Sequence, residues 1–364
     1  MRKHNENNER VKRAYFNYLK EAQRYGEASV DAAAAAISRF EQHTRHRDFK
    51  TFHHQQAIAF KRHLADQTNG RGDGKLSKST IRSTLAALKK FFEWLAREPG
   101  FRSRLTISDA DYFNPSDRDS RIALAQRPRP IPTLEQVIHV LSQMPSATTV
   151  QQRDRALIAF IALTACRDGA AATLKLKHID VSAGRVFQDA REVNTKNGKT
   201  ITTYFFPVGD LPLKIFTHWI SDLRTVHLWG PDDPLFPATE MGVGEQGLFQ
   251  PTGLKRRHWQ NAGPIRRIFK TSFQNAGLSY FHPHSFRHML ARRGQELCQT
   301  PEQFKAWSQN LGHENVLTTF TSYGKIEEYR QGELIKALSA ATDNDDNIGD
   351  LLSKLAAATK RRSS

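Results

Sequence analysis

The stretch His284-Ser-Phe-Arg287, followed by Leu311-Gly312-His313, carries most of what this sequence says about fold and function. Tyr323 comes ten residues after His313, and far upstream Arg167 ends an apolar run and Lys196 precedes an Asn-Gly pair. Arginine forks hold phosphodiesters, histidine and lysine transfer protons, and a phenol oxygen can attack phosphorus. No carboxylate cluster accompanies these residues. The set therefore favours phosphodiester chemistry that needs no divalent metal and no other cofactor.

The charge of the chain points to the same class of substrate. Lys and Arg outnumber Asp and Glu by 54 to 37 in 364 residues, which gives a formal net charge of +17. Such a charge on a folded protein favours a polyanionic partner, because each neutralised phosphate releases condensed counterions. A nucleic acid is therefore the expected partner, and a merely basic soluble protein is the alternative.

The two cysteines, Cys166 and Cys298, cannot make a disulfide framework. The chain shows no run of eighteen apolar residues and no signal-peptide pattern, since residues 1–13 are polar and charged. We therefore expect no membrane association and a reducing cytoplasm.

Residues 1–9 are predicted to be a flexible N-terminus and residues 10–113 a helical domain. The clearest helix runs from Ser79 to Ala96, because its apolar residues recur every three or four positions. That stripe consists of Ile81, Leu85, Leu88, Phe92 and Leu95.

A second, basic stripe lies on the same helix. It contains Lys78, Arg82 and Lys89, and Lys75 lies just before it. A solvated face is the usual meaning of such a stripe. In a chain this basic, we expect these four residues to contact a DNA backbone.

Residues 114–132 read as an extended, basic linker stiffened by Arg127-Pro-Arg-Pro-Ile-Pro132. A second domain is predicted over residues 133–340, with Thr133 and Gln136 as the capping box of its first helix. Residues 341–364 form a tail. Its amphipathic segment Ile348–Leu355 is either a helix that docks on a neighbouring subunit or a frayed end.

Three short strands are predicted in the second domain, over Arg185–Asp189, Glu192–Lys196 and Thr200–Pro207. The last two flank Asn197-Gly198, a strong signal for a tight hairpin. Most of the remaining sequence has helical periodicity, interrupted by a Gly- and Pro-rich stretch at 230–253. The expected fold is therefore mainly α with a small antiparallel β-sheet.

These motifs, in this order, resemble those of the tyrosine recombinase (phage integrase) family along essentially the whole chain. Thr164-Ala-Cys-Arg167, with Leu174-Lys-Leu-Lys-His-Ile-Asp180, is similar to the first arginine box of the family. Thr195-Lys196-Asn-Gly-Lys199 resembles its β-hairpin lysine. Two later stretches are similar to the second and third boxes of the family: His284-Ser-Phe-Arg287-His288 and Leu311-Gly-His313-Glu-Asn-Val-Leu-Thr-Thr319.

The resemblance implies a two-domain, C-shaped clamp around double-stranded DNA, with a core-binding (SAM-like) DNA-binding domain at 10–113 and a catalytic domain at 133–340. It implies a site-specific recombinase that acts as a homo-tetramer on two recombination sites, through a four-way junction. An integrase of a mobile element is the expected member, with accessory DNA-bending or directionality proteins as further possible partners.

The resemblance also implies which groups hold the scissile phosphate. Arg167 and Arg287 would grip its non-bridging oxygens and stabilise the charge of the pentavalent transition state. His313 would donate a hydrogen bond to the same phosphate.

Three further residues would carry out the nucleophilic attack and the proton transfers. Tyr323 would attack phosphorus and leave a 3′-phosphotyrosine and a free 5′-hydroxyl. His284 would accept the phenol proton, and Lys196 would protonate the departing 5′-oxygen. Rejoining would need no ATP, because the tyrosyl linkage keeps the energy of the phosphodiester.

The sequence departs from the family pattern in three places. Ala170 stands where members often carry Glu or Asp, and Asp168 is a candidate to orient a catalytic partner instead. The spacing from His313 to Tyr323 is ten residues where nine is usual; Tyr329 is the second candidate nucleophile. Lys199 competes with Lys196, which matches the hairpin position better.

Two other functions fit part of the sequence. His282, His284 and His288 could bind zinc, because positions i and i+4 of a helix suit two ligands. No Asp, Glu or Cys accompanies them in that stretch. A catalytically silent DNA-binding protein of the same fold, with an architectural or regulatory role, is the other alternative.

Overall fold

The computed structural model describes residues 4–70, 72, 74–125, 130–244, 247–313, 329 and 331–333. The chain divides into two compact units, Met1–Arg127 and Pro128–Ser364. In this described part, no helix has the length and apolar character needed to cross a membrane.

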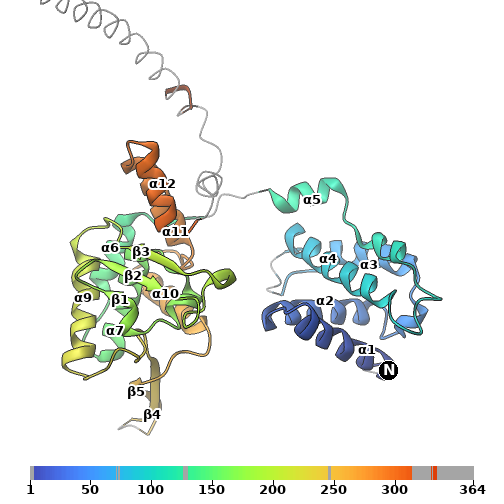
Figure 1. The fold of residues 1–364 in the computed structure, drawn as a ribbon, viewed down its shortest axis with the longest axis horizontal. Helices are drawn as coiled ribbons and strands as arrows, with labels where there is room; N and C mark the ends of the chain where they lie inside the picture. Colours follow the sequence, from blue (N-terminus) through green and yellow to red (C-terminus); the bar gives the residue numbers. More distant parts are fainter. Residues whose placement is uncertain are drawn as a thin grey trace, which may run out of the picture. The chain divides into compact units, whose positions relative to one another are not determined.

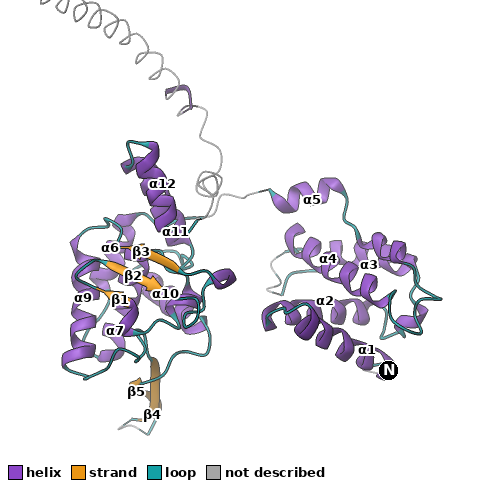
Figure 2. Ribbon diagram, viewed as in Figure 1, coloured by secondary structure: helices purple, strands orange, loops and turns teal. Residues whose placement is uncertain are grey.

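The first unit is built from helices (Figures 1 and 2). Its α-helices are α1 (Glu6–Asn17), α2 (Glu27–His43), α3 (His54–Asp66), α4 (Lys78–Leu95) and α5 (Asp117–Leu124). Shorter turns are the π-helical η1 (Tyr18–Ala22) and the 3₁₀ helices η2 (Phe49–Thr51) and η3 (Ile107–Phe113).

Helix α4 packs its apolar stripe into the core of this unit, as its periodicity predicts. Ser77 begins the helix by accepting a 3.1 Å hydrogen bond from the Thr80 N–H. Phe92 is buried and lies 5.4 Å from Phe40 of α2, ring to ring. Burial of each such side chain stabilises the fold by about 1.5–3 kcal/mol.

The prediction of a flexible stretch at residues 1–9 is wrong for residues 6–9. Asn5 caps α1 through its side-chain oxygen, which accepts from the backbone N–H groups of the next turn. Asn8 is fully buried; it donates to Glu41 at 3.0 Å and accepts from the Phe49 N–H at 3.0 Å. These contacts join the start of the chain to α2 and η2.

The linker predicted at 114–132 is not extended throughout. Residues Asp117–Leu124 form α5, whose N-cap Ser116 accepts a 3.1 Å bond from the Asp119 N–H. Acidic side chains in the first turn stabilise the helix, because their negative charges interact favourably with the positive end of the helix dipole.

The second unit combines helices with two small antiparallel sheets (Figure 2). Its helices are α6 (Leu134–Gln143), α7 (Thr149–Thr164), α8 (Asp168–Ala171), η4 (Leu176–His178), η5 (Lys196–Gly198), α9 (Asp210–Thr225), α10 (Gly263–Asn275), α11 (Ser285–Leu297) and α12 (Pro301–Asn310). The strands are β1 (Ile179–Asp180), β2 (Arg185–Gln188), β3 (Ile201–Tyr204), β4 (Ala238–Val243) and β5 (Phe249–Lys255). The predicted fold class, mainly α with a small antiparallel sheet, is confirmed.

Helix α7 runs through the core of this unit. Every residue from Ala156 to Thr164 is buried. Helix α6 begins as predicted, since Thr133 and Gln136 form a capping box with bonds of 2.9 and 3.2 Å.

The strand predicted at Glu192–Lys196 does not form. The sheet order is β1-β2-β3, and its last pair is Gln188 with Ile201, so residues 189–200 form a long loop. Asn197 and Gly198 adopt the positive φ angles, 61° and 63°, that a tight turn requires. No ladder flanks them, because residues 192–194 are bound to the body of the unit instead.

The β4–β5 hairpin was not predicted. It begins within the Gly- and Pro-rich stretch at 230–253 and runs on to Lys255, and its register shifts between Glu240 and Met241. Glycines and Pro251 within these strands obscure the alternation that reveals a strand in sequence.

Candidate active site

Arg167 follows a sharp end of α7. Ala165 closes that helix in the left-handed conformation, with φ 52°. The Thr164 hydroxyl donates to the Phe160 carbonyl at 2.7 Å and accepts from the Cys166 N–H at 3.2 Å. These bonds turn the chain so that Arg167, partly exposed, stands at the N-cap of α8.

Arg287, in the first turn of α11, is buried with 6% of its surface exposed. Its Nη1 donates to the Ala165 carbonyl at 2.8 Å, and its Nη2 donates to the Leu311 carbonyl. Two carbonyls from distant segments therefore fix the plane of the guanidinium group.

His313 follows the C-terminal end of α12, which has a well-defined hydrogen-bond pattern. The His313 N–H donates to Ser308 at 3.1 Å and the Gly312 N–H to Gln309 at 2.7 Å, as in a Schellman motif. Gly312 has φ +71°, and a Cβ there would lie 3.1 Å from Ile201 of β3. Gly312 thus ends α12 and also allows the close approach of β3.

The His313 ring contacts the same arginine. Nη2 of Arg287 donates to Nε2 of His313 across 3.2 Å. A neutral imidazole in this arrangement carries its proton on Nδ1. Burial, together with the positive charges of Arg287 and Arg167, lowers the pKa of His313 to about 4.

His284 is the N-cap of α11 and is exposed at the surface. Its ring makes an edge-on contact with His288, 5.2 Å between centroids. Partial burial and the positive charges of Arg287, His288 and Arg167 lower its pKa to about 4. Both arginines therefore act electrostatically on both candidate histidines, so the four predicted residues lie close together.

Lys196 lies on the loop between β2 and β3, in the short turn η5, and is exposed. Among the described residues, no hydrogen bond or ion pair joins it to Arg167, His284, Arg287 or His313. The loop could therefore present Lys196 to a substrate rather than to the protein.

Tyr323 lies outside the described residues, and so does the segment Ile348–Leu355. Tyr329, the second candidate nucleophile, is described and is 77% exposed.

Asp168 pairs with Arg266 of α10 at 2.7 Å, and its other oxygen accepts from the Gly169 N–H at 2.9 Å. Ala170, next to these groups, is buried. Asp168 thus joins α8 to α10.

The basic residues predicted to contact DNA lie on the first unit, and three of them have ion-pair partners. Lys75 pairs with Asp66 at 2.9 Å, Lys78 with Asp119 at 2.7 Å and Lys89 with Asp111 at 2.7 Å. Arg82 is exposed, and it has no ion-pair partner in the part of the chain that the structure describes.

Where residues are described, no group of three or more His, Cys, Asp or Glu side chains could hold a metal ion. His282 of the predicted histidine cluster accepts the His284 backbone N–H on its Nδ1, at 3.2 Å.

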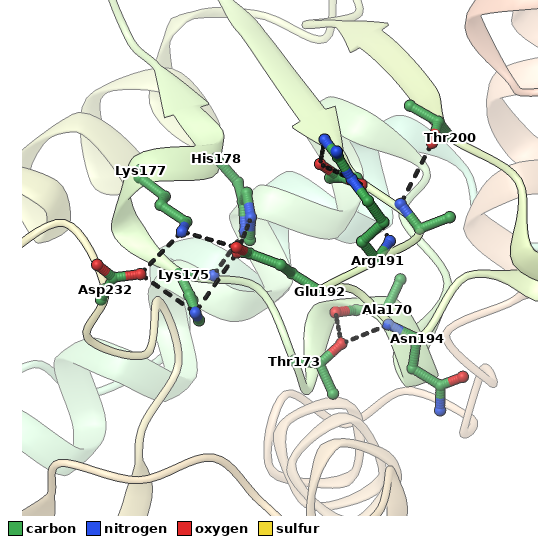
Figure 3. Close-up of polar contacts among 12 residues, drawn as sticks. Ala170, Thr173, Lys175, Lys177, His178, Arg191, Glu192, Asn194, Thr200 and Asp232 are labelled. Carbon is green, nitrogen blue, oxygen red and sulfur yellow. Dashed lines mark hydrogen bonds and ion pairs between the residues drawn. The ribbon is translucent and has the colours of Figure 1, made fainter.

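The sequence did not reveal a polar network beside this site (Figure 3). Glu192, on the Lys196 loop, meets Lys175, Lys177 and His178, and Asp232 meets the same two lysines. The sequence shows lysine and leucine alternating at residues 174–177, just before His178. It does not show that these lysines and His178 bind Glu192, which lies in a predicted strand.

Comparison with known proteins covers both units. The phage integrase family matches residues 133–329, and the N-terminal SAM-like domain of phage integrases matches residues 13–99. Tyrosine recombinase XerC of Escherichia coli O157:H7 is 23% identical over 246 residues, which cover 67% of this chain and 69% of that protein.

Two solved structures share the fold. A lambda integrase dimer bound to a COC′ core site has a TM-score of 0.59 and 14% identity, with 88% of this chain and 96% of that chain covered. The Tn1549 transposon integrase in complex with transposon right end DNA has a TM-score of 0.51 and 13% identity, with coverage of 90% and 99%.

Proposed function

Because this chain belongs to the phage integrase family, we propose that six of its residues cut and rejoin DNA at specific sites in the manner of a tyrosine recombinase. They are Arg167, Lys196, His284, Arg287, His313 and Tyr323. The enzyme is a DNA strand transferase, as its family membership implies. The assignment of roles to the six residues is the proposal.

In the cleavage step, the Tyr323 oxygen forms a bond to phosphorus as the bond from phosphorus to O5′ breaks. The phenol proton passes to His284, which is neutral before the reaction because its pKa is lowered to about 4. Lys196 gives a proton to O5′. The products are a 3′-phosphotyrosine and a 5′-hydroxyl, and the reverse steps rejoin the strand.

Arg167 and Arg287 stabilise the charge that develops on the phosphoryl oxygens. A preorganised donor of this kind contributes about 10²–10³-fold to a rate. The buried carbonyl contacts of Arg287 keep its guanidinium in one orientation. It therefore need not reorganise when the substrate arrives.

One observation carries this proposal: the Arg287 guanidinium bonds both to the Ala165 carbonyl, two residues before Arg167, and to the His313 ring. In keeping with this, both arginines lower the pKa of both histidines. An anion bound among these four side chains would be attracted by two permanent charges. It would also meet two neutral imidazoles that can accept or donate protons.

Covalent capture tests the proposal. The wild-type chain is incubated with nicked duplexes that have a randomised core, and DNA that enters the phenol phase with protein is recovered. We expect an adduct that Tyr323→Phe abolishes while DNA binding in a gel-shift assay is retained. The matched control Tyr329→Phe should keep the adduct.

The absence of any adduct with the wild-type chain would overturn the proposal. It would favour a catalytically silent DNA-binding protein of the same fold. An adduct that survives Tyr323→Phe and is lost in Tyr329→Phe would reassign the nucleophile.

The metal-dependent alternative is tested in the same assay. Adduct formation in excess EDTA should equal that without EDTA. A zinc site at His282, His284 and His288 would instead lose its metal and its activity.

On DNA, the two units are proposed to close around the duplex as a clamp, and four chains to assemble on two sites. If Ile348–Leu355 docks on a neighbouring subunit, truncation after Ala341 should weaken the pairing of two sites more than binding to one. Equal losses would argue against docking. A mobile-element integrase of the bacterial cytoplasm and nucleoid, with accessory DNA-bending proteins, remains the proposed biological setting.

A further inference from the structure

The loop at 189–200 carries Lys196 between β2 and β3, and its two limbs are tied together. The Ala190 N–H donates to the Thr200 hydroxyl at 3.3 Å. After the loop, Ile201 lies against Gly312, next to His313. The position of Lys196 therefore depends on what holds the residues before it.

Glu192, four residues before Lys196, binds three side chains at once (Figure 3). Its Oε1 lies 2.9 Å from Lys177 Nζ, and its Oε2 lies 3.4 Å from Lys175 Nζ. Oε2 also lies 3.2 Å from Nε2 of His178. Lys177 is the main cause of the lowered pKa of Glu192, so this carboxylate is ionised at neutral pH.

The contact with His178 has a defined direction. The Lys175 backbone N–H donates to Nδ1 of His178 at 3.0 Å. Burial lowers the pKa of His178, so its ring is neutral at pH 7 and carries its proton on Nε2. Nε2 then donates to Glu192. Because only 4% of the His178 side chain is exposed, water cannot readily replace this bond.

The next two residues strengthen the attachment. Val193 is buried in the core of the unit. The Asn194 N–H donates to the Thr173 hydroxyl at 2.8 Å, and that hydroxyl donates to the Ala170 carbonyl at 3.1 Å. Ala170 belongs to α8, the helix that Arg167 begins. Residues 192–194 thus hold the loop against the segment that carries Arg167.

Asp232 shows which contact is specific to the loop. It pairs with Lys175 at 3.2 Å and Lys177 at 2.8 Å, as Glu192 does, but lies in the segment between α9 and β4. Ion pairs exposed to solvent contribute little to stability by themselves. Of these two carboxylates, only Glu192 accepts the hydrogen bond from the buried His178 ring.

We infer that Glu192 is a positioning residue, which holds the loop so that Lys196 can protonate the leaving 5′-oxygen. This inference rests on the role proposed above for Lys196. In this role Glu192 acts through Lys196 and takes no part in the bond changes at phosphorus. Its loss should slow only the step in which O5′ departs.

The test varies the leaving group. A duplex recovered by covalent capture is synthesised in two forms, one with the normal O5′ and one with sulfur in that bridging position. A thiol has a pKa of about 8.5 and leaves as its anion without a proton donor. Cleavage rates of both duplexes are measured for the wild-type chain, Lys196→Ala, Glu192→Ala, Glu192→Gln and Asp232→Asn.

With the oxygen duplex, Glu192→Ala should cleave about 10–100-fold more slowly, the size expected when a catalytic group is displaced. With the sulfur duplex it should match the wild type within about 2-fold, since the leaving sulfur needs no proton from Lys196. Glu192→Gln keeps an acceptor for His178 and should lose less. Asp232→Asn, the matched control, should match the wild type on both duplexes.

The outcomes separate the two proposals. If Lys196→Ala is not rescued by sulfur, the proposed role of Lys196 fails, whatever Glu192 does. If Lys196→Ala is rescued and Glu192→Ala slows both duplexes equally, Glu192 supports the fold alone and the inference is overturned. An unchanged rate for Glu192→Ala on the oxygen duplex would overturn it as well.

Discussion

Arg287 Nη1 donates a 2.8 Å hydrogen bond to the carbonyl of Ala165, a residue that lies 122 positions earlier in the chain. Ala165 is two residues before Arg167, so this bond links the two arginines that are proposed to hold the phosphate. The orientation of one arginine thus depends on the turn that presents the other.

Replacement of Arg287 by lysine should damage both activity and stability. A lysine keeps the charge but cannot donate along two fixed directions, so a buried carbonyl of Ala165 or Leu311 loses its donor. We expect a loss of about 1–3 kcal/mol in the free energy of unfolding. Cleavage should fall by about 10²-fold or more. Denaturant titration and adduct formation measure the two effects.

Arg292→Lys is the control for this substitution, because Arg292 lies on the same helix and is 66% exposed. It should change the free energy of unfolding by less than about 0.5 kcal/mol. Full cleavage activity in Arg287→Lys would contradict the proposed grip on the phosphate.

Substitution of Gly312 by alanine should disturb the position of His313. Left-handed backbone costs an alanine about 1–2 kcal/mol, and the new Cβ would also press on Ile201, 3.1 Å away. Gly277→Ala supplies the comparison, since Gly277 has φ +74° and no atom within 4 Å of the added Cβ. Both variants should melt at lower temperature, but Gly312→Ala alone should lose cleavage activity. Equal activity in the two would argue against a role for this close contact.

The histidine pKa values predict how stability depends on pH. His284 and His313 have folded-state pKa values of about 4, below the unfolded value of about 6.5. The unfolded chain therefore binds more protons between these values, so stability falls as pH drops from 6.5 towards 4. Denaturant titrations of the wild type and His313→Gln at pH 7 and 5 test this. The variant should lose less stability, and equal losses would contradict the shift at His313.

The basic residues of the first unit should differ in their contribution to DNA binding. Removal of one phosphate contact lowers the slope of log affinity against log salt by about 1. Arg82→Ala should show this loss on a random-sequence duplex between about 50 and 200 mM salt. Lys89→Ala should show less, because Lys89 must first leave Asp111. A larger effect at Lys89 would mean that its ion pair opens on DNA.

Local patterns in the sequence predicted the elements that depend on local physics. The apolar stripe of α4 and the capping box of α6 both formed where spacing and residue type required. The family, too, could be inferred from the order of its motifs, and the match over 133–329 confirms it.

Long-range contacts account for what could not be predicted. Glu192–Lys196 alternates as a strand would, yet Val193 is buried and Glu192 binds side chains that lie 14 to 17 residues earlier. Likewise, no sequence pattern indicates that Arg287 donates to Ala165 and Leu311. Such pairs arise only when distant segments pack together.

The buried course of α7 has a consequence for the safety of the cell's DNA. Ala165 can meet Arg287 only when α7 lies in its core and α11 and the end of α12 have closed over it. If Arg167 and Arg287 hold the phosphate as proposed, a nascent or half-unfolded chain cannot bring both guanidinium groups to one phosphorus atom. Strand cleavage would then be withheld until the protein has finished folding.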